Sequence, residues 1–266
     1  MSERVRLAAL DIDGTIVDHD DRLSERVRKA VAAVVATGVH VVVATGRSLH
    51  GTLPVLDRLG LTTGWTVCSN GAVLLRLDPE LDDGYEIAHA ETFDPTAALQ
   101  LLRTHLPTAM YAVEDVGAGF HLSAPFPADE LTGQLHVVEF EQLLDRPATR
   151  VIVRSTDHTP EDFTDLMQKI GLHGVNYAVG WSAWLDLAPD GVSKASALER
   201  VRSALDVPVP ATLAVGDGRN DLEMFAWAGR SVAMGQAVPE VRAAATDVTE
   251  PVELDGLALV LEAMIA

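Results

Sequence analysis

The sequence predicts an α/β protein with a doubly wound, Rossmann-like parallel-sheet core and an inserted α+β cap domain. Near both ends of the chain, short continuous apolar runs alternate with helical patterns, as expected of strands covered on both faces. In the middle, several strand patterns alternate between apolar and polar residues, which is typical of antiparallel sheets with one exposed face. These observations predict two domains of different architecture.

The predicted core begins with a buried strand over Val5–Leu10. A helix follows, because Ser24 can cap it and apolar residues recur from Val27 onward at helical spacing. Gly38 stands where a helix commonly ends in a left-handed residue. The other core elements are strands over Val39–Ala44, near Trp65–Cys68 and over Thr212–Val215, and helices that end at Gly60, cover Ser193–Leu205 and follow Asp221.

The inserted domain is predicted from two helical and five strand patterns in the middle of the chain. The helices cover Leu99–Leu106 and Asp162–Ile170, and the strands cover Met110–Val113, Phe120–Ser123, Val151–Val153, Val175–Val179 and Trp184–Leu187. We therefore expect a core of residues 1–86 and 188–266, interrupted by a cap domain of residues 87–187.

Composition narrows the classes of function. The 266 residues carry a net charge of -19, which argues against a nucleic-acid partner, because such a partner demands clustered Lys and Arg. The chain has neither an N-terminal signal pattern nor an apolar run of roughly 18 residues, so we expect no membrane partner. Cys68 is the single cysteine, which excludes an intrachain disulfide and favours a cytoplasmic location. The sequence does not set the oligomeric state.

The first chemical signal is Asp11-Ile12-Asp13-Gly14-Thr15, directly after a buried strand. In an open α/β sheet, ligands bind just beyond the carboxyl ends of the strands. Two carboxylates at i and i+2 could enter one crevice there, one as a nucleophile and the other as an acid/base. An acidic pair after a strand is common by itself, and the complete string is much more specific.

Two further strings follow predicted strands in the same way. Thr45-Gly46-Arg47 offers a hydroxyl, a close backbone approach and a guanidinium, which together suit phosphate oxygens. Taken alone, it is better explained as a helix-initiating turn with an exposed arginine. Ser69-Asn70-Gly71 is locally an ordinary Asn-Gly turn between strands, and only its position favours a functional role.

The last two signals lie in the C-terminal part of the core. Gly216-Asp217-Gly218-Arg219-Asn220-Asp221 places two acids four residues apart on a glycine-rich turn, which suits Mg²⁺. A solvated turn with a helix cap would explain one of these acids but not the whole string. Lys194 stands where a helix begins, against the helix dipole, so we expect an anion to neutralise it, although an exposed lysine is locally as good an explanation.

As an ordered set, these strings resemble the haloacid dehalogenase (HAD) superfamily of phosphohydrolases, and more narrowly its Cof-type branch (HAD-IIB) with a C2B cap. DIDGT, TGR, SNGA, GVSK and GDGRND occur in the family's order, and the predicted insertion lies between SNGA and GVSK. The resemblance covers the whole chain. It implies the core and cap described above, a phosphatase activity and a Mg²⁺ cofactor.

The resemblance also implies roles for individual residues. Asp11 would be the nucleophile that becomes phosphorylated, and Asp13 the acid/base. Mg²⁺ would be held by Asp11, Asp217 and the Asp13 backbone carbonyl, with support from Asp221. The residues implied to bind the phosphate or substrate are Thr45, Gly46, Arg47, Asn70, Gly71, Lys194 and Asn220.

Charge counting agrees with a metal. Asp11, Asp13, Asp217 and Asp221 bring four negative charges, and Lys194 with Arg47 returns two positive ones. The remaining two negative charges would repel a phosphate dianion unless one Mg²⁺ offset them, since a pair of unit charges at about 4 Å interacts by roughly 4 kcal/mol near a protein surface.

We therefore expect a Mg²⁺-dependent phosphatase acting on a small phosphorylated metabolite, such as a sugar phosphate. A sugar phosphomutase on the same scaffold is the nearest alternative, and a phospho-accepting signalling module is a more distant one. We expect the inserted domain to select the leaving group, because the core motifs address only phosphate and metal. Candidate contacts there are Tyr111, Glu114, His121, Trp181 and Trp184.

Overall fold

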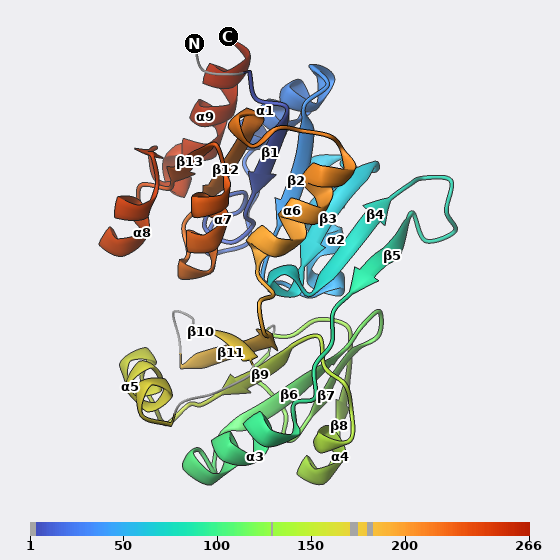
Figure 1. Cartoon of the computed structure of the whole chain (residues 1–266), viewed down its shortest axis with the longest axis vertical. Coiled ribbons are helices and arrows are strands. Elements are labelled where there is room, and N and C mark those ends of the chain that lie inside the picture. The colour runs from blue at the N-terminus through green and yellow to red at the C-terminus, as the bar shows by residue number, and fades with distance from the viewer. Residues whose placement is uncertain (1–3, 129, 171–174, 180–182) are drawn as a thin grey trace. The chain divides into compact units, whose positions relative to one another are not determined.

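The computed structural model describes residues 4–128, 130–170, 175–179 and 183–266 (Figure 1). The chain divides into two compact units. The first, here called the core unit, comprises Met1–Gly46, Thr52–His89 and Ser193–Ala266. The second, here called the inserted unit, comprises Arg47–Gly51 and Ala90–Val192, so it includes a short segment that precedes the predicted insertion.

The core unit is built on one eight-stranded sheet with the order β14-β13-β12-β1-β2-β3-β4-β5. The strands are β1 (Leu7–Leu10), β2 (His40–Ala44), β3 (Gly64–Cys68), β4 (Val73–Leu77), β5 (Tyr85–Ala90), β12 (Thr212–Gly216), β13 (Arg230–Ala233) and β14 (Asp247–Val248). Neighbouring strands from β14 to β3 are parallel, and β4 returns antiparallel to β3.

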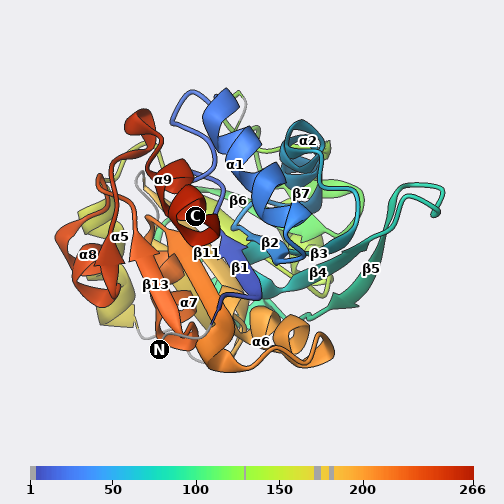
Figure 2. The ribbon, with the colours of Figure 1, turned by 90° about the horizontal axis from the view of Figure 1, so that it is seen from above.

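Helices cover both faces of this sheet, which confirms the doubly wound α/β class. They are α1 (Glu25–Ala36), α2 (Leu49–Leu59), α6 (Lys194–Ala204), α7 (Leu222–Trp227), α8 (Pro239–Ala244) and α9 (Gly256–Ile265). Figure 2 shows α1, α2 and α9 on one side of the strands and α6 and α7 on the other. On β1, Ala8 and Leu10 pack in the first apolar cluster and Leu7 and Ala9 in the second. This burial on both faces explains why the strand is a continuous apolar run.

The predicted ends of the first helix are also confirmed. The Ser24 hydroxyl accepts a hydrogen bond from the Val27 amide at 3.1 Å, which satisfies one of the unpaired N–H groups at the start of α1. Gly38 follows the C-terminus with a φ of +85°, a conformation that glycine adopts without steric strain.

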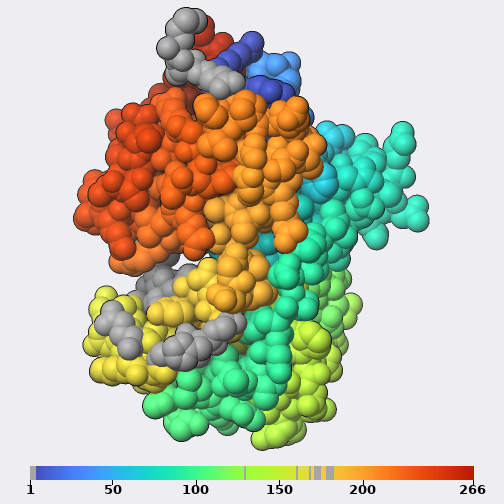
Figure 3. Space-filling view, viewed as in Figure 1, coloured from blue at the N-terminus to red at the C-terminus, as the bar shows by residue number. Residues whose placement is uncertain are grey.

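The edge hairpin of β4 and β5 is absent from the sequence-based prediction. Most side chains of β5 are exposed or half-exposed, so the strand has no clear apolar face to identify it. In the space-filling view, the loop between the two strands, coloured cyan, stands out from the rest of the core unit (Figure 3). Pairing with β4 rather than local pattern determines this strand.

The inserted unit is an α+β structure with its own six-stranded sheet, in the order β10-β11-β9-β6-β7-β8. The strands are β6 (Met110–Asp115), β7 (Gly119–Leu122), β8 (Gln134–Val137), β9 (Val151–Arg154), β10 (Val175–Val179) and β11 (Trp184–Pro189). Its pairs are antiparallel, as predicted, except that β8 runs parallel to β7. The side chains of β8 are all exposed, which explains why its pattern gave no strand signal.

One face of this second sheet is covered by α3 (Thr96–His105), α4 (Phe140–Leu144) and α5 (Pro160–Ile170). Leu99, Leu143 and Phe163 from these helices pack with strand residues in one apolar cluster. A smaller apolar cluster, which includes Phe120 and Ile152, lies among residues of the opposite face. None of the described helices in either unit is long and apolar enough to cross a lipid bilayer.

Candidate active site

The predicted motifs gather at the carboxyl ends of the parallel strands of the core sheet. Asp11 follows β1, Thr45 follows β2, Ser69 follows β3, Asp217 follows β12 and Lys194 opens α6. The chain continues from β1 to β2 and β3 on one side, and from β12 to β13 and β14 on the other. The strand order therefore reverses between β1 and β12, and such a switch point is where open α/β sheets bind ligands.

Three buried carboxylates meet at this switch point. One oxygen from each of Asp11, Asp217 and Asp221 can be chosen so that all three lie within 4.8 Å of one another. Asp13 does not belong to this group, and its side chain is exposed. Burial is the main cause that raises the pKa of Asp11 and of Asp217, and the charge of Asp13 adds to both shifts, so it acts on the same site.

Lys194 lies between two of these carboxylates. Its ammonium nitrogen Nζ donates to Asp11 Oδ1 at 2.6 Å and to Asp221 Oδ1 at 2.7 Å, and the side chain is fully buried. These two carboxylates neutralise a lysine that the helix dipole alone would disfavour at the start of α6. Their charges raise the pKa of Lys194 above its ordinary value although burial opposes the shift, so the lysine is protonated.

Asp221 also organises the loop that carries Asp217. Its second oxygen, Oδ2, accepts from the Asp217 amide at 3.0 Å and from the Gly218 amide at 2.9 Å. Asp221 lies in a short 3-10 turn over Arg219–Asp221 and is completely buried. Since both of its oxygens have partners, it joins the lysine to the backbone of the loop after β12.

Burial and the charges of neighbouring acids make Asp11 and Asp217 harder to ionise. Burial, followed by the charge of Asp221, raises the pKa of Asp11 well above its usual range, although Lys194 opposes the shift. The same two causes raise the pKa of Asp217 to about 6. Three carboxylates face a single ammonium group here, so a divalent cation would remove much of the repulsion. Carboxylate oxygens are the ligands that Mg²⁺ prefers, so the residues present fit this metal.

The loop after β1 touches the loop after β12 at Gly14. A Cβ added to this glycine would lie 2.2 Å from Asp217 Oδ2, and its φ of +73° also favours glycine. Next to this contact, the Gln236 side-chain Nε2 donates to Gly14 O at 2.6 Å and to Asp217 Oδ2 at 3.2 Å. Sequence reasoning missed Gln236. The signal available was its position, because it follows β13 as the other site residues follow their strands.

Most of the predicted phosphate-binding residues come together beside the carboxylates. Thr45 is fully buried, and its carbonyl oxygen accepts from the Asn70 amide at 3.0 Å. Asn70 Oδ1 in turn accepts from Asn220 Nδ2 at 3.0 Å, which links the strings after β3 and β12. A Cβ on Gly46 would lie 3.0 Å from Asn70 Oδ1, so Gly46 allows this close approach.

Of the two remaining predicted residues, Gly71 belongs to the core unit, whereas Arg47 groups with the inserted unit. A Cβ on Gly71 would lie 2.1 Å from Ser193 O, so this glycine packs directly against the residue that precedes Lys194. Arg47 groups with the inserted unit, and its Nη1 donates to Gly51 O at 3.4 Å. The buried cation that the core unit itself places beside its carboxylates is therefore Lys194.

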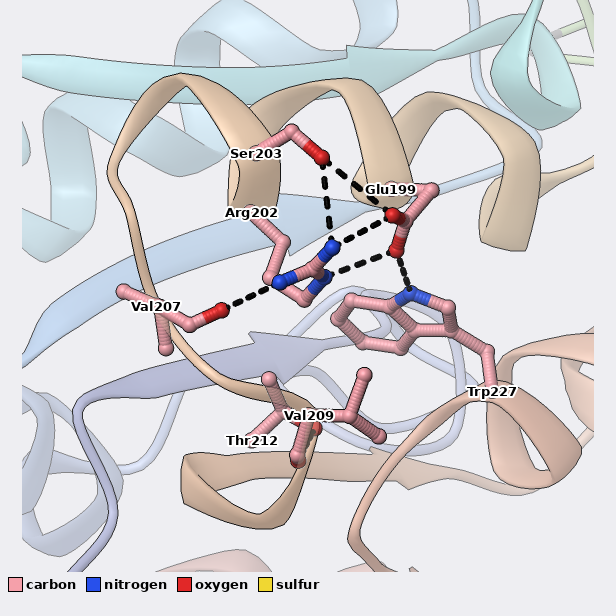
Figure 4. Close-up of polar contacts among 7 residues, drawn as sticks. All are labelled: Glu199, Arg202, Ser203, Val207, Val209, Thr212 and Trp227. Carbon is pink, nitrogen blue, oxygen red and sulfur yellow. Dashed lines mark hydrogen bonds and ion pairs between the residues drawn. The ribbon is translucent and has the colours of Figure 1, made fainter.

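A polar cluster further along α6 anchors the helix that begins with Lys194 (Figure 4). Glu199 Oε2 accepts from the Trp227 indole Nε1 at 2.9 Å, and the Arg202 guanidinium donates to both oxygens of Glu199 at 2.6 and 2.8 Å. Hydrogen bonds from Arg202, and then from Trp227, lower the pKa of Glu199 to about 2. Since Trp227 ends α7, the cluster ties the lysine helix to the helix that follows Asp221.

The candidate substrate contacts of the inserted unit separate by sheet face. Tyr111 is fully buried in the helix-covered cluster and its hydroxyl donates to Leu106 O at 2.8 Å, so it is a packing residue. His121 pairs with Val113 in the sheet and shares this face. Glu114 and Trp184 lie on the opposite face, since they pair with Phe120 and Arg154. Trp181 lies outside the described residues.

Comparison with known proteins places this arrangement in a family. The family profile of the haloacid dehalogenase-like hydrolases matches residues 8–261. The chain belongs to this family. The protein YkrA of Bacillus subtilis, named "Putative phosphatase YkrA", is 30% identical to this haloacid dehalogenase-like hydrolase over 266 residues, which are 95% of each chain. The HMP-PP phosphatase of Serratia proteamaculans is 27% identical and covers 89% of this chain and 86% of its own.

Solved structures agree at the level of the fold. A haloacid dehalogenase-like hydrolase from B. subtilis has a TM-score of 0.82 at 23% identity and covers 97% of this chain and 99% of its own. The subclass IIB sugar phosphatase BT4131 has a TM-score of 0.81 at 21% identity, with 97% and 98% covered. The resemblance predicted from the sequence motifs is thus confirmed.

Proposed function

We propose that this haloacid dehalogenase-like hydrolase is a Mg²⁺-dependent phosphatase that hydrolyses small phosphomonoesters, such as sugar phosphates, through an aspartyl-phosphate on Asp11. The family and its relatives make the chain a phosphoric monoester hydrolase. The observation that carries the finer proposal is the buried group of Asp11, Asp217, Asp221 and Lys194 at the switch point of the sheet.

In the first step, a carboxylate oxygen of Asp11 attacks phosphorus and the bond from phosphorus to the leaving oxygen breaks. Lys194 holds Asp11 Oδ1, which orients the carboxylate so that its other oxygen can act as the nucleophile. Asp13 lies two residues further along the same loop with an exposed side chain, so it can give its proton to the leaving alkoxide.

In the second step, Asp13 takes a proton from water, and the resulting hydroxide attacks the phosphorus of the aspartyl-phosphate. The bond between phosphorus and Asp11 breaks, so the Asp11 carboxylate is restored and inorganic phosphate leaves. Asp13 thus alternates between acid and base, a role that requires access to solvent and that its exposure supports.

The metal would be held by the side chains of Asp11 and Asp217 and by the Asp13 backbone carbonyl, with support from Asp221. When bound, Mg²⁺ supplies positive charge that offsets the carboxylates and stabilises charge on the transferring phosphoryl group. The four acids, counted with Lys194 and Arg47, retain two negative charges, which one Mg²⁺ would offset.

The phosphate oxygens would be bound by Lys194 and by the hydroxyl and amide groups gathered beside it. The proposed contacts are Thr45, Gly46, Arg47, Asn70, Gly71 and Asn220. We also propose that the inserted unit selects the leaving group. Replacing it with the corresponding unit of a relative should transfer substrate preference and keep the metal requirement. An unchanged preference in a folded chimera would refute this.

Release of inorganic phosphate from a panel of phosphorylated metabolites tests the proposed reaction. Wild type should release phosphate with Mg²⁺ and not after chelation with EDTA, whereas a phosphomutase would give an isomeric phosphate ester. Asp11→Asn should be inactive, because an amide does not attack phosphorus. Asp57→Asn, which removes an exposed carboxylate from α2, is the matched control. More than one per cent of wild-type activity in Asp11→Asn, a loss of less than about 3 kcal/mol of transition-state stabilisation, would exclude this nucleophile.

Asp13→Asn gives an independent test of the second step. The turnover rate should fall by about 10²–10⁴-fold, the usual contribution of general acid–base catalysis. Phosphoenzyme should accumulate with substrates that have good leaving groups, because attack by Asp11 is preserved while water is no longer activated. Equal losses for aryl and alkyl phosphates with no phosphoenzyme would assign the acid/base role to another group.

A further inference from the structure

We propose that Gln236 is a positioning residue for the divalent cation, because its side chain joins the loop after β1 to the loop after β12. This inference rests on the proposed function, since it concerns the same site. The ligand is a hard divalent cation, with Mg²⁺ as the probe. Gln236 itself touches neither substrate nor the attacked phosphorus, and acts through the residues it holds.

The backbone around Gln236 is fixed. The residue lies in the short connection from β13 to α8, where the Met234 amide donates to Gly216 O at 2.9 Å and the Ala237 amide donates to Met234 O at 3.0 Å. Gly216 is the last residue of β12, so this connection is attached to the strand that carries Asp217. The side chain therefore projects from a support that is already tied to one of the two loops.

The three partners of the Gln236 amide define its orientation. Gly14 O and Asp217 Oδ2 can only accept hydrogen bonds, and the Val252 amide can only donate one. The Gln236 Nε2 therefore faces the first two, at 2.6 and 3.2 Å, while its Oε1 accepts from Val252 N at 3.1 Å. Rotating the amide by half a turn would place acceptor against acceptor at both loops. A single orientation satisfies all three contacts.

The two loops approach each other closely at Gly14, and each turns an acceptor atom toward the Gln236 amide. The space where a Cβ of Gly14 would stand is occupied by Asp217 Oδ2, at 2.2 Å. The carbonyl oxygen of Gly14 and this carboxylate oxygen would repel each other without a shared N–H₂ group. The bond to Gly14 O also restrains the backbone beside Asp13, whose carbonyl is a proposed ligand. Partners that orient metal ligands typically contribute 10–100-fold to metal affinity.

Titration of the substrate-free protein with Mg²⁺ by calorimetry tests this role, together with the Mg²⁺ dependence of phosphate release. Gln236→Met has nearly the same shape but neither donates nor accepts. We expect its Kd for Mg²⁺ to rise at least tenfold, with a matching rise in the Mg²⁺ concentration that gives half-maximal activity. The substrate KM at saturating Mg²⁺ should change less than threefold.

Val252→Pro serves as the matched control. It removes the N–H that Gln236 Oε1 accepts, together with the buried Val252 side chain of the first apolar cluster, at the first residue of a short 3-10 turn over Val252–Leu254, where proline is tolerated. It should reduce stability and leave the Kd for Mg²⁺ within threefold of wild type. A merely structural role would instead lower the stability of both variants and shift the Kd of neither.

Three results would overturn the inference or its basis. An unchanged Kd in folded Gln236→Met refutes the positioning role while the proposed function stands. If wild type binds no Mg²⁺, the proposed function fails first. If Gln236→Met does not fold, Gln236→Asn replaces it. It keeps the amide but is one methylene shorter, so it cannot span both loops and Val252, and a wild-type Kd in that variant would refute the inference equally well.

Discussion

Replacing Gly71 with alanine tests how closely the turn after β3 packs against the start of α6. Gly71 has a φ of +105°, and a Cβ there would lie 2.1 Å from Ser193 O and 3.1 Å from Lys194 N. Gly64 has the same φ of +105° with nothing within 4 Å of its Cβ position. Gly64→Ala therefore measures backbone strain alone, and Gly71→Ala measures strain together with overlap.

The magnitudes follow from these two geometries. Left-handed backbone costs an alanine about 1–2 kcal/mol, and the smaller entropy of its unfolded chain returns about 0.4–1 kcal/mol. Gly64→Ala should therefore lower the free energy of unfolding by about 1 kcal/mol. Overpacking adds about 1–3 kcal/mol at Gly71, so the total there should be about 2–4 kcal/mol. Real Cβ atoms essentially never approach closer than 3.0 Å, so the two segments must separate by roughly 1 Å.

Such a displacement moves Lys194 away from Asp11 and Asp221, to which it now donates at 2.6 and 2.7 Å. Misplacement by about 1 Å can reduce a rate by about 10²-fold, so we expect kcat/KM of Gly71→Ala to fall at least tenfold. Gly64→Ala should keep near wild-type activity. Urea denaturation and phosphate release measure the two effects. Equal stability and equal activity in the two variants would show that Gly71 does not pack against Ser193.

The remaining predictions concern the charged groups of the core unit. Lys194→Met leaves Asp11 and Asp221 without their ammonium partner and should destabilise the fold by about 3–5 kcal/mol at pH 7, whereas the exposed Lys29→Met should change stability by less than about 0.5 kcal/mol. The loss of stability should be smaller at pH 5, because the raised pKa of Asp11 lets the folded protein bind a proton there. Urea denaturation at both pH values measures this, and equal losses at pH 7 and pH 5 would contradict it. Glu199→Gln should cost less than about 1 kcal/mol at pH 7, because the carboxylate is only partly shielded from solvent. The pKa of Glu199 is lowered from 4.5 to about 2 in the folded protein, so its stabilisation is present above pH 4.5 and is lost as the pH falls toward 2. In thermal melts followed by Trp227 fluorescence, the difference in stability between Glu199→Gln and wild type should therefore shrink over that range. A constant difference would refute the ion pair.

Local patterns were sufficient for two elements of the core. The strand β1 was predicted correctly because both of its faces are covered, and α1 because Ser24 and Gly38 mark its ends. The strand β4 was missed although it is a buried apolar run, whereas two other missed strands lack such local signals. Strands β5 and β8 are largely exposed, so they depend on pairing with β4 and β7.

The site divides in the same way. The acids after β1 and β12 were found because carboxylates next to glycine at a strand's end have a recognisable chemistry. Gln236 was missed because one amide after β13 has no such signature, and its importance comes only from the two loops it contacts. Tyr111 was a candidate substrate contact by residue type, yet its ring and hydroxyl are both used inside the inserted unit.

By itself, the sequence determined the α/β class, the set of reactive residue types and the family that they indicate, because each depends on periodicity or on short strings. Only the tertiary structure decided which side chains meet. Lys194 and Asp11 are 183 residues apart in the chain, and they form a buried ion pair because α6 begins beside the switch point where β12 lies against β1. That adjacency depends on strand order, which non-local pairing and burial decide and which no local window of sequence contains.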